Sequence, residues 1–462
     1  MKTIKSSVPI AFFAAALVAL AAAGCGTNDD GNGKHDGWGD VTPDSLPPDY
    51  VPPDVPPTDG TTDTPSDVFT GPSGTVRGVV YSPQGWVPEI PNFPVSGALI
   101  YIALPAYPPD PIPEGAVCNL CVTIDETVPH AFSAADGTFE FSAPQGAWLL
   151  VVQKGEFRKL AYIDVVADTM NEIDRSMTTF PRVNAPPNDT TPKMAIALGS
   201  YDIMEDIVAK MGLCGLNSEY HWDGMPCDHI DMFCNKDSYF DSCDSTPFAN
   251  LLQDLAWMKE YDVIFVPCSD STTDDMLSNP TVLSNIRQYV NDGGKWYIAD
   301  WSYDWVEQAF PEFIDFEGED TVIGDADMSS GEFDTIGHST DADLSNWLLA
   351  IGDPATNIDF IENWDCIQSL GTVPGFDEEG NPISITPYTW AAGPVTRSNS
   401  CIAGDAPLTI TFPYGCGKVL FTTYHTVGAM GGESRANLMT QEKILFYLIL
   451  EIGLCTEEVI VI

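Results

Sequence analysis

The hydrophobic pattern of this chain changes once, at the polar joint of residues 184–192, and this change constrains the fold more than any other feature. Before the joint, short runs of β-branched and aromatic residues are separated by turn signals every several residues. After it, buried-type strands alternate with helical patterns. The first pattern indicates a β-sandwich, and the second indicates a parallel sheet with helices on both faces. We therefore predict an all-β sandwich over residues 75–183 and an α/β doubly wound parallel sheet over residues 190–462.

Three segments of the first region carry a family resemblance. They are GTVRGVVYSPQG, PVSGALIYI and ADGTFEFSAPQGAWLLVVQKGEFRK, and the last contains an Asp136-Gly137 turn signal between two expected strands. The region resembles the carboxypeptidase regulatory-like domain, a prealbumin-like sandwich of seven strands. The resemblance implies a structural, adhesive or carbohydrate-binding-like module, and it implies no catalytic residue.

The second region places four buried-type strands and a terminal helix along the chain. We expect strands at residues 193–198, 261–267, 295–299 and 418–424, and a long apolar helix at 442–451. The segments YDVIFVPCSDS, IRQYVNDGGKWYIADWSYDWVEQAFP and GKVLFTTYHT are similar to the class I glutamine amidotransferase-like fold, including its trehalose-utilisation-type relatives. If the resemblance holds, residues of about 214–248 and 312–405 are expected to be irregular insertions.

Three reactive side chains follow the expected strands of this region. Cys268 and Asp300 each follow a strand end, and His425 follows the strand that ends at Tyr424. In open α/β sheets, reactive groups gather at the carboxyl ends of the strands. The resemblance implies that Cys268 occupies the position of the nucleophile and His425 lies near the position of the catalytic histidine.

The sequence departs from the amidotransferase pattern in two respects. The family's Gly-x-Cys-x-Gly elbow is replaced by Val266-Pro267-Cys268-Ser269-Asp270, which lacks both glycines. The family's His-x-Glu is replaced by His425-Thr426-Val427, which lacks the acid, and Glu433 is a distant third candidate. Two hypotheses therefore stay open: an inert thiol in a non-catalytic protein, or a thiol-dependent hydrolase or amidotransferase that uses Cys268 and His425.

The amino end has the features of an export signal. Lys2 and Lys5 precede an apolar run, and Leu20-Ala21-Ala22-Ala23-Gly24-Cys25 resembles the lipobox of bacterial lipoproteins. The resemblance implies a signal peptide at residues 1–24 and a lipid on Cys25, and Gly26 favours the outer membrane over the inner one. The alternative is an ordinary signal peptide cut near Ala23.

Residues 25–74 are expected to form a disordered linker. Residues 26–74 hold ten Asp, nine Pro and one Lys, so they lack the apolar content of a core and are stiffened and extended by proline and charge. The whole chain has 19 basic and 67 acidic residues, a formal charge of −48. This balance excludes nucleic acid as a partner and favours an acidic, soluble surface. The lipid is the expected membrane contact.

Twelve cysteines in an exported chain indicate disulfides. We expect a small Cys118–Cys121 loop bridge, two bridges that staple the first insertion, and two more from the late cysteines, which leaves Cys268 unpaired. The disulfide candidates are Cys118, Cys121, Cys214, Cys227, Cys234, Cys243, Cys366, Cys401, Cys416 and Cys455. Zinc in the first insertion is the alternative, but structural zinc sites usually have close Cys-x2–4-Cys pairs. No metal site and no cofactor are predicted.

The combined sequence evidence favours an extracytoplasmic lipoprotein that binds or displays, with a glycan or a surface protein as the expected partner. Carbohydrate binding through the sandwich is one form of this hypothesis, and the thiol enzyme is its competitor. The sequence names no substrate and no oligomeric state.

Overall fold

The computed structural model describes residues 69–83, 90–118, 124–235, 245–269, 274–319, 322–324, 332–377, 380–395, 401–426, 438–453 and 460–461. The expected signal peptide, Cys25 and the linker up to residue 68 lie outside these ranges, as do Glu433 and Asp270. Residues from Thr64 to Ile462 belong to one compact unit. Among the helices of the described residues, none combines the length and the apolar character needed to cross a membrane.

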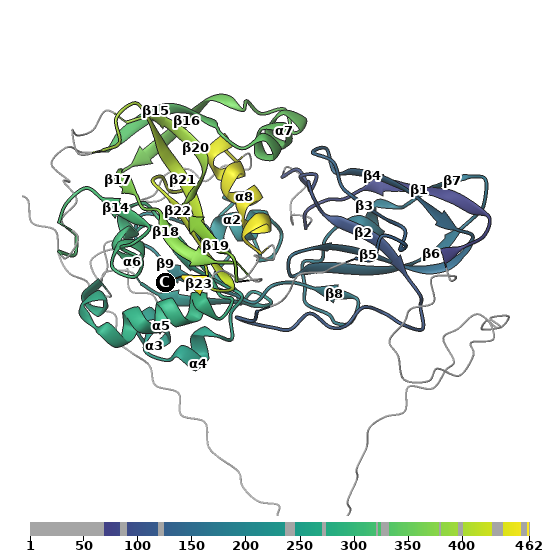
Figure 1. Ribbon diagram of the computed structural model, residues 1–462, viewed down its shortest axis with the longest axis horizontal. Helices are drawn as coiled ribbons and strands as arrows, with labels where there is room; N and C mark the ends of the chain where they lie inside the picture. Colours follow the sequence, from purple (N-terminus) through teal and green to yellow (C-terminus); the bar gives the residue numbers. More distant parts are fainter. Residues whose placement is uncertain are drawn as a thin grey trace, which may run out of the picture. The chain divides into compact units, whose positions relative to one another are not determined.

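Two sheets form the first part of the compact unit (Figure 1). The smaller has the order β4-β1-β7, with β4 (Thr138–Pro144), β1 (Ser73–Val79) and β7 (Met170–Glu172). The larger has the order β3-β2-β5-β6-β8, with β3 (His130–Phe132), β2 (Leu99–Ala103), β5 (Gly146–Lys154), β6 (Phe157–Val165) and β8 (Asp189–Thr190). We call these two sheets the sandwich. Because β8 pairs with β6, the polar joint of the sequence belongs to the sandwich rather than to a free connection.

Alternation along the strands builds the core of the sandwich. In β4, Phe139 and Phe141 are buried while Glu140 between them is exposed, as expected for a strand with one face turned inward. Residues of both sheets share one apolar cluster. The Asp136-Gly137 turn forms, with Gly137 at φ +76°, but the strands on its two sides, β3 and β4, belong to different sheets. The turn therefore joins the two layers.

A ten-stranded mixed sheet forms the second part, which we call the α/β part. Six neighbouring strands are parallel: β11 (Thr246–Pro247), β10 (Ile230–Cys234), β9 (Met194–Leu198), β12 (Val263–Val266), β13 (Lys295–Ala299) and β22 (Gly417–Thr422). Four antiparallel strands extend the sheet beyond β22: β21 (Asp405–Tyr414), β20 (Tyr388–Pro394), β15 (Phe333–Ser339) and β16 (Thr356–Asn363).

The four antiparallel strands correct the expectation of a wholly parallel sheet. β15, β16 and β20 lie in the segment of residues 312–405, and β10 lies in the segment of residues 214–248. Both segments were expected to be irregular insertions. Their patterns explain the difference, because β16 alternates buried Ile358 and Phe360 with exposed Asp359, which is the two-residue period of a half-buried strand. The insertions therefore widen the sheet.

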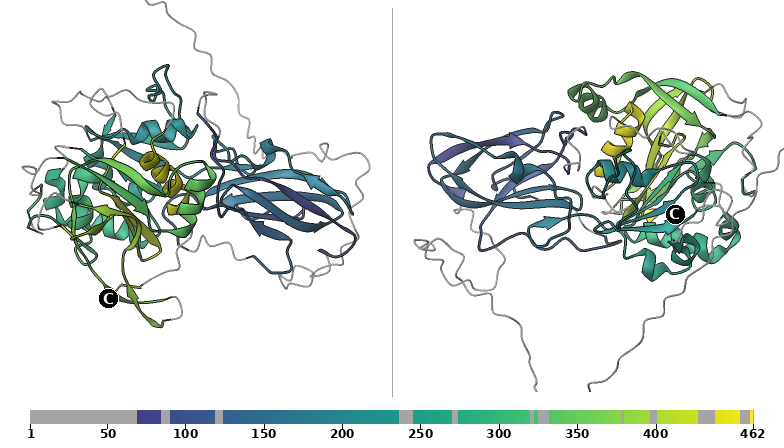
Figure 2. Two further views of the ribbon diagram at one scale, coloured as in Figure 1. Left: turned by 90° about the horizontal axis from the view of Figure 1, so that it is seen from above. Right: turned by 180° about the vertical axis from the view of Figure 1, so that it is seen from behind.

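Helices cover both faces of the parallel strands (Figures 1 and 2). Successive residues of β9 point to opposite faces, so Ile196 packs in one apolar cluster and Ala197 in the other. The first cluster includes α2 (Met204–Lys210), α7 (Ala342–Ala350) and α8 (Thr440–Ile452), and the second includes α3 (Phe248–Leu252), α5 (Pro280–Asn291) and α6 (Asp304–Glu307). Asn279 caps the start of α5 through a hydrogen bond from the Thr281 amide, and Gly293, at φ +112°, follows the end of this helix.

The remaining elements are short. They are α1 (Arg175–Thr178), α4 (Leu255–Met258), β14 (Ile314–Phe316), β17 (Ile367–Leu370), β18 (Val373–Phe376), β19 (Pro382–Ile385), β23 (Ile460–Val461) and two 3₁₀ turns, η2 (Asp274–Ser278) and η3 (Asp300–Ser302). η3 matters for the site because it begins directly after β13.

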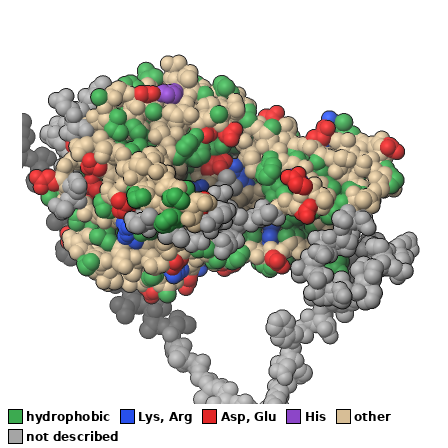
Figure 3. Space-filling model, in the orientation of Figure 1, with side chains coloured by type: hydrophobic (Ala, Val, Ile, Leu, Met, Phe, Trp, Pro, Cys, Tyr) green, Lys and Arg blue, Asp and Glu red, His purple; other side chains and the backbone are tan. Residues whose placement is uncertain are grey.

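Acidic side chains are spread over the surface of the compact unit. Figure 3 shows Asp and Glu side chains at several separate places on the face in view. No basic patch accompanies them among the described residues of that face. This distribution agrees with the strongly acidic composition.

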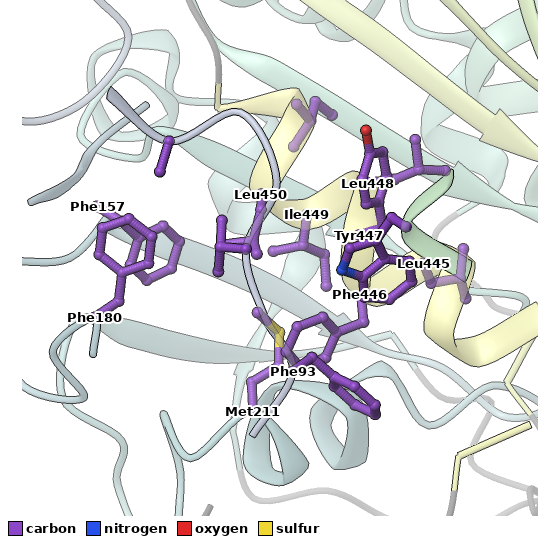
Figure 4. Close-up of a cluster of buried hydrophobic side chains, with 14 of the residues drawn as sticks. Phe93, Phe157, Phe180, Met211, Leu445, Phe446, Tyr447, Leu448, Ile449 and Leu450 are labelled. Carbon is purple, nitrogen blue, oxygen red and sulfur yellow. The ribbon is translucent and has the colours of Figure 1, made fainter. Parts of the chain in front are cut away.

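The sandwich and the α/β part share a buried aromatic cluster. Phe93 contacts Phe446 of α8 with ring centroids 5.1 Å apart, and Trp347 of α7 donates a hydrogen bond to the carbonyl of Pro94. Figure 4 shows Phe157 and Phe180 of the sandwich on one side of this cluster and α8 side chains on the other. The described residues of both parts therefore pack around one continuous core.

Two buried ion pairs and a disulfide cross the same contact. Lys295 Nζ lies 2.6 Å from Glu156 Oε1, and both side chains are almost completely buried. Lys154 forms an ion pair with Glu451 at the end of α8. Cys118 is bonded to Cys416, across 298 residues of sequence.

Candidate functional site

Three neighbouring parallel strands bring the predicted residues together. β12, β13 and β22 lie side by side in the sheet, so their carboxyl ends meet at one edge. Cys268 follows β12, Asp300 follows β13 and His425 follows β22. The side-chain donor atoms of these three residues all lie within 4.8 Å of one another, and all three residues are buried. We call Cys268, Asp300 and His425 the strand-end cluster.

Carboxylates hold both nitrogens of the histidine. His425 Nδ1 lies 2.7 Å from Asp300 Oδ2, and His425 Nε2 lies 3.1 Å from Glu362 Oε2. Glu362 belongs to β16, one of the antiparallel strands, and its side chain is 33% exposed. Glu362 therefore lies between the buried cluster and solvent.

The backbone around the cluster is itself constrained. Asp300 has φ +47° and Glu362 has φ +60°, both in the left-handed region that residues other than glycine rarely adopt. Asp300 Oδ1 accepts a hydrogen bond from the Trp364 amide, which lies just after β16, and Gln441 of α8 donates to the carbonyl of His425. Strained residues held by their surroundings are concentrated at functional sites.

A second carboxylate lies beside the cluster. Asp202 follows β9, the neighbour of β12, and is completely buried. Its Oδ1 accepts hydrogen bonds from the amide and the hydroxyl of Thr426, the residue after His425. Its Oδ2 has no hydrogen-bond partner among the residues that the structure describes. The parallel strands thus place two buried carboxylates, one thiol and one imidazole at one edge.

Burial dominates the protonation of the cluster. Burial first and the charge of Asp300 second raise the pKa of Cys268 to about 12, and His425 only partly opposes these effects. Burial alone would lower the pKa of His425, but its hydrogen bonds to Asp300, Cys268 and Glu362 outweigh burial and raise that pKa well above its usual value. Burial therefore favours the thiol form of Cys268 at neutral pH, and the partners of His425 favour its charged form.

This arrangement differs from an activated cysteine. A nucleophilic thiolate needs a lowered pKa and a base within reach. Here the thiol is buried with a raised pKa, and both imidazole nitrogens face carboxylates. Asp300 occupies the orienting position for which only the distant Glu433 was considered from the sequence.

The sequence pointed to three of the five residues of this edge. Cys268, Asp300 and His425 were each identified by their place after a strand, although Asp300 was not linked to His425. Asp202 could have been found by the same rule, because it follows the first buried strand of the α/β part by four residues. No sequence pattern predicts the contact of Glu362 with His425, because Glu362 lies in a segment that is expected to be irregular.

The remaining cysteines contradict two expectations, the Cys118–Cys121 bridge and a second bridge among the late cysteines, because Cys416 is bonded to Cys118. Cys118 bonds Cys416, which lies between β21 and β22, and not Cys121. Cys214 bonds Cys227 and Cys366 bonds Cys401, while Cys234 is also disulfide-bonded. Cys121, Cys243 and Cys455 lie outside the described residues. Among the described cysteines, Cys268 is the free one.

Comparison with known proteins gives weak likenesses. The chain matches no protein-family model, and no curated protein matches it. Among solved structures it is similar to a cytoplasmic protein from Salmonella typhimurium (13% identity, 48% of this chain, 81% of that chain, TM-score 0.29). It is also similar to a cold-adapted β-galactosidase from Rahnella sp. R3 (12%, 57% and 32%, 0.28) and to a ThuA-like protein from Parabacteroides merdae (11%, 57% and 88%, 0.30). TM-scores of this size do not establish a shared fold, so no family follows from them.

Proposed function

We propose that this chain is a lipoprotein of the bacterial cell envelope that binds a ligand or a partner protein rather than catalysing a reaction. The lipobox-like sequence at Cys25 and the acidic, proline-rich linker after it support the anchoring half of the proposal. Gly26 after the cysteine supports the outer membrane as the location. Mass spectrometry of the amino-terminal peptide from native membranes tests this half, because an unmodified or absent Cys25 contradicts it.

The proposed domain families are a prealbumin-like, carboxypeptidase regulatory-like sandwich over residues 75–183 and a class I glutamine amidotransferase-like domain over residues 190–462. The two facing sheets support the first assignment. The parallel run β10-β9-β12-β13-β22, with helices on both faces, supports the second. The sandwich family implies no catalytic residue. The amidotransferases require a Gly-x-Cys-x-Gly elbow and a His-x-Glu pair, and this chain has neither motif.

The burial and the raised pKa of Cys268 are the main support for a non-catalytic function. Its side chain is buried, its pKa is raised to about 12, and the imidazole beside it is held by Asp300 and Glu362. A thiol in this state is a poor nucleophile at neutral pH. The missing glycines on both sides of Cys268 remove the elbow that shapes an oxyanion hole in the enzymes.

Alkylation of the native protein tests this point. We expect iodoacetamide at pH 7–8 to leave Cys268 unmodified over hours and to label it at once after unfolding, as read by peptide mass spectrometry. A His425→Gln variant serves as the control for activation by the imidazole. Rapid labelling of native Cys268 that disappears in this variant would overturn the non-catalytic proposal.

The competing function is a thiol-dependent hydrolase, and one observation favours it. Asp300 Oδ2 lies 2.7 Å from His425 Nδ1, which gives the order nucleophile, base and orienting acid found in Cys-His-Asp enzymes. In such an enzyme Glu362 has to leave Nε2 when substrate binds. The same alkylation experiment decides between the two functions.

The sandwich offers a place for the proposed glycan. A hollow on its surface is lined by Phe132, Arg77, Glu140 and Glu172, and the Phe132 side chain is 62% exposed. Arg77 forms an ion pair with Glu172 there. Sugars bind to an exposed aromatic ring flanked by charged hydrogen-bonding groups, so we propose this hollow as the contact.

A glycan array tests the hollow. We expect binding to at least one polysaccharide class and its loss in Phe132→Ala, with retention in Tyr162→Ala, which removes an equally exposed ring elsewhere on the sandwich. If the wild-type chain binds no glycan on the array, glycan binding by this hollow is wrong and a protein becomes the proposed partner.

A further inference from the structure

The strand-end cluster contains the donor types that a transition metal prefers. It combines a thiol, an imidazole and a carboxylate, which are the three kinds of side chain that bind Zn²⁺. The three come from residues far apart in sequence, and the parallel strands bring them to one point. The other described group with cysteines, Glu317 with Cys366 and Cys401, is not comparable, because its two cysteines form a disulfide.

The spacing of the donor atoms suits one small cation. Zinc bonds of about 2.0–2.3 Å in a tetrahedron put ligand atoms roughly 3.3–3.6 Å apart. The donor atoms of Cys268, Asp300 and His425 lie within 4.8 Å of one another, and the Nδ1–Oδ2 distance is 2.7 Å. For both atoms to bind one ion, Nδ1 and Oδ2 have to move apart from 2.7 Å to roughly 3.3 Å.

Glu362 is placed as an outer partner of such a centre. A metal-bound histidine usually donates its other ring nitrogen to a carboxylate, which fixes the ring and strengthens the ligand. His425 has this arrangement, with Nε2 3.1 Å from Glu362 Oε2 and Nδ1 directed to the cluster. Glu362 is partly exposed, so it is the member of this group that reaches solvent.

Asp202 gives the independent indication of a ligand. It is completely buried, and its Oδ2 has no hydrogen-bond partner among the described residues. Leaving a buried carboxylate oxygen unpaired is costly. Burial raises the pKa of Asp202 while the nearby His425 lowers it, so this carboxyl group lies close to the cluster. A cation bound there would favour its charged form.

We propose that Cys268, Asp300 and His425 bind one divalent cation of the zinc class, with Glu362 as the outer carboxylate and Asp202 as the neighbouring counter-charge. This differs from the sequence-based expectation of no metal. The mixed sulfur, nitrogen and oxygen donor set selects Zn²⁺ or Co²⁺ over Ca²⁺ and Mg²⁺, which require mostly oxygen ligands. The site is independent of the glycan hollow, so the two proposals fail separately.

Cobalt titration of the lipidated chain in detergent, after dialysis against a chelator, tests the site. We expect one equivalent of Co²⁺ to give a thiolate-to-cobalt charge-transfer band and tetrahedral d–d bands, and Zn²⁺ to displace it. Cys268→Ser should abolish the charge-transfer band, and His425→Gln should lower the affinity at least tenfold. Glu362→Gln should weaken binding by about 10–100-fold, as outer-shell carboxylate changes do.

Two controls separate this site from binding by the acidic surface. His338→Gln removes an exposed histidine on β15 paired with Asp405, and it should leave the bands unchanged. Circular dichroism checks that each variant is folded. If a variant fails to fold, X-ray absorption of the zinc-loaded wild type supplies the answer, because sulfur in the first shell supports the site and an all-oxygen shell overturns it. Absence of the charge-transfer band in the folded wild type also overturns it, whether or not the chain binds glycan.

Discussion

At the scale of single residues, the chemistry of this chain depends on burial. In water, a cysteine thiol has a pKa near 9 and a histidine imidazole has a pKa near 6.5. Inside the protein the pKa values of both side chains are raised, so the folded state keeps its protons to higher pH than the unfolded chain does. Without a bound metal, Cys268 and His425 of the strand-end cluster therefore bind their protons more tightly in the folded state than in the unfolded chain.

This difference predicts a loss of stability on the alkaline side. For His425 the stabilisation is fully present below pH 6.5 and is lost as the pH rises toward its higher folded-state pKa. For Cys268 it is lost between pH 9 and about pH 12. Each proton contributes a slope of at most about 1.4 kcal/mol per pH unit. Urea unfolding of chelator-treated protein from pH 6 to 10 should show the decline.

Variants identify which group causes the decline. Cys268→Ser should flatten the profile above pH 9, and His425→Gln should flatten it from pH 6.5 upward. His338→Gln, on the surface, should keep the wild-type profile. Parallel profiles for all four proteins would show that the cluster does not hold its protons as described.

At the scale of elements, the sequence predicted the parallel strands better than the rest. β9, β12, β13 and β22 lie where runs of buried-type residues predicted them, because a strand covered on both faces needs continuous apolar sequence. The antiparallel strands β15 and β16 were not predicted because half-buried alternation is a weaker signal and is interrupted by bulges, as between Gly337 and His338. Long-range partners such as Glu362 and Cys416 could not be predicted, since their contacts depend on how those elements pack.

The turn between β5 and β6 packs closely against the end of α8, and this contact can be tested by mutation. Gly155 has φ +55°, and a Cβ there would lie 2.3 Å from the carbonyl oxygen of Gly453, just after α8. We expect Gly155→Ala to destabilise the protein by about 1–3 kcal/mol, because backbone has to move in addition to adopting a strained φ. Gly224→Ala is the matched control, with φ +77° and nothing within 4 Å of its Cβ. Equal losses in urea unfolding would show that the contact with Gly453 does not matter.

At the scale of the whole molecule, the sandwich and the α/β part behave as one body in the described residues. Buried charges reinforce this, because Lys295 with Glu156 and Lys154 with Glu451 each place one partner in either part. Removing one member of such a pair leaves a buried charge uncompensated, which costs about 3–5 kcal/mol. These contacts favour one body over two independently moving modules among the described residues.

Removing the Cys118–Cys416 disulfide tests whether the sandwich and the α/β part unfold as one body. This disulfide links the sandwich end of the chain to β21 and β22 across 298 residues, so removing it frees a very long loop in the unfolded state. We expect Cys118→Ser with Cys416→Ser to lower the free energy of unfolding by about 2–5 kcal/mol, more than Cys366→Ser with Cys401→Ser, which frees 35 residues. The aromatic cluster around Phe93 and the buried ion pairs should still hold both parts together, so tryptophan fluorescence and circular dichroism should report one coincident transition in each variant. Two separated transitions in the Cys118→Ser, Cys416→Ser variant would mean that the disulfide alone couples the parts, and a ligand held by the sandwich would then leave the strand-end cluster unaffected.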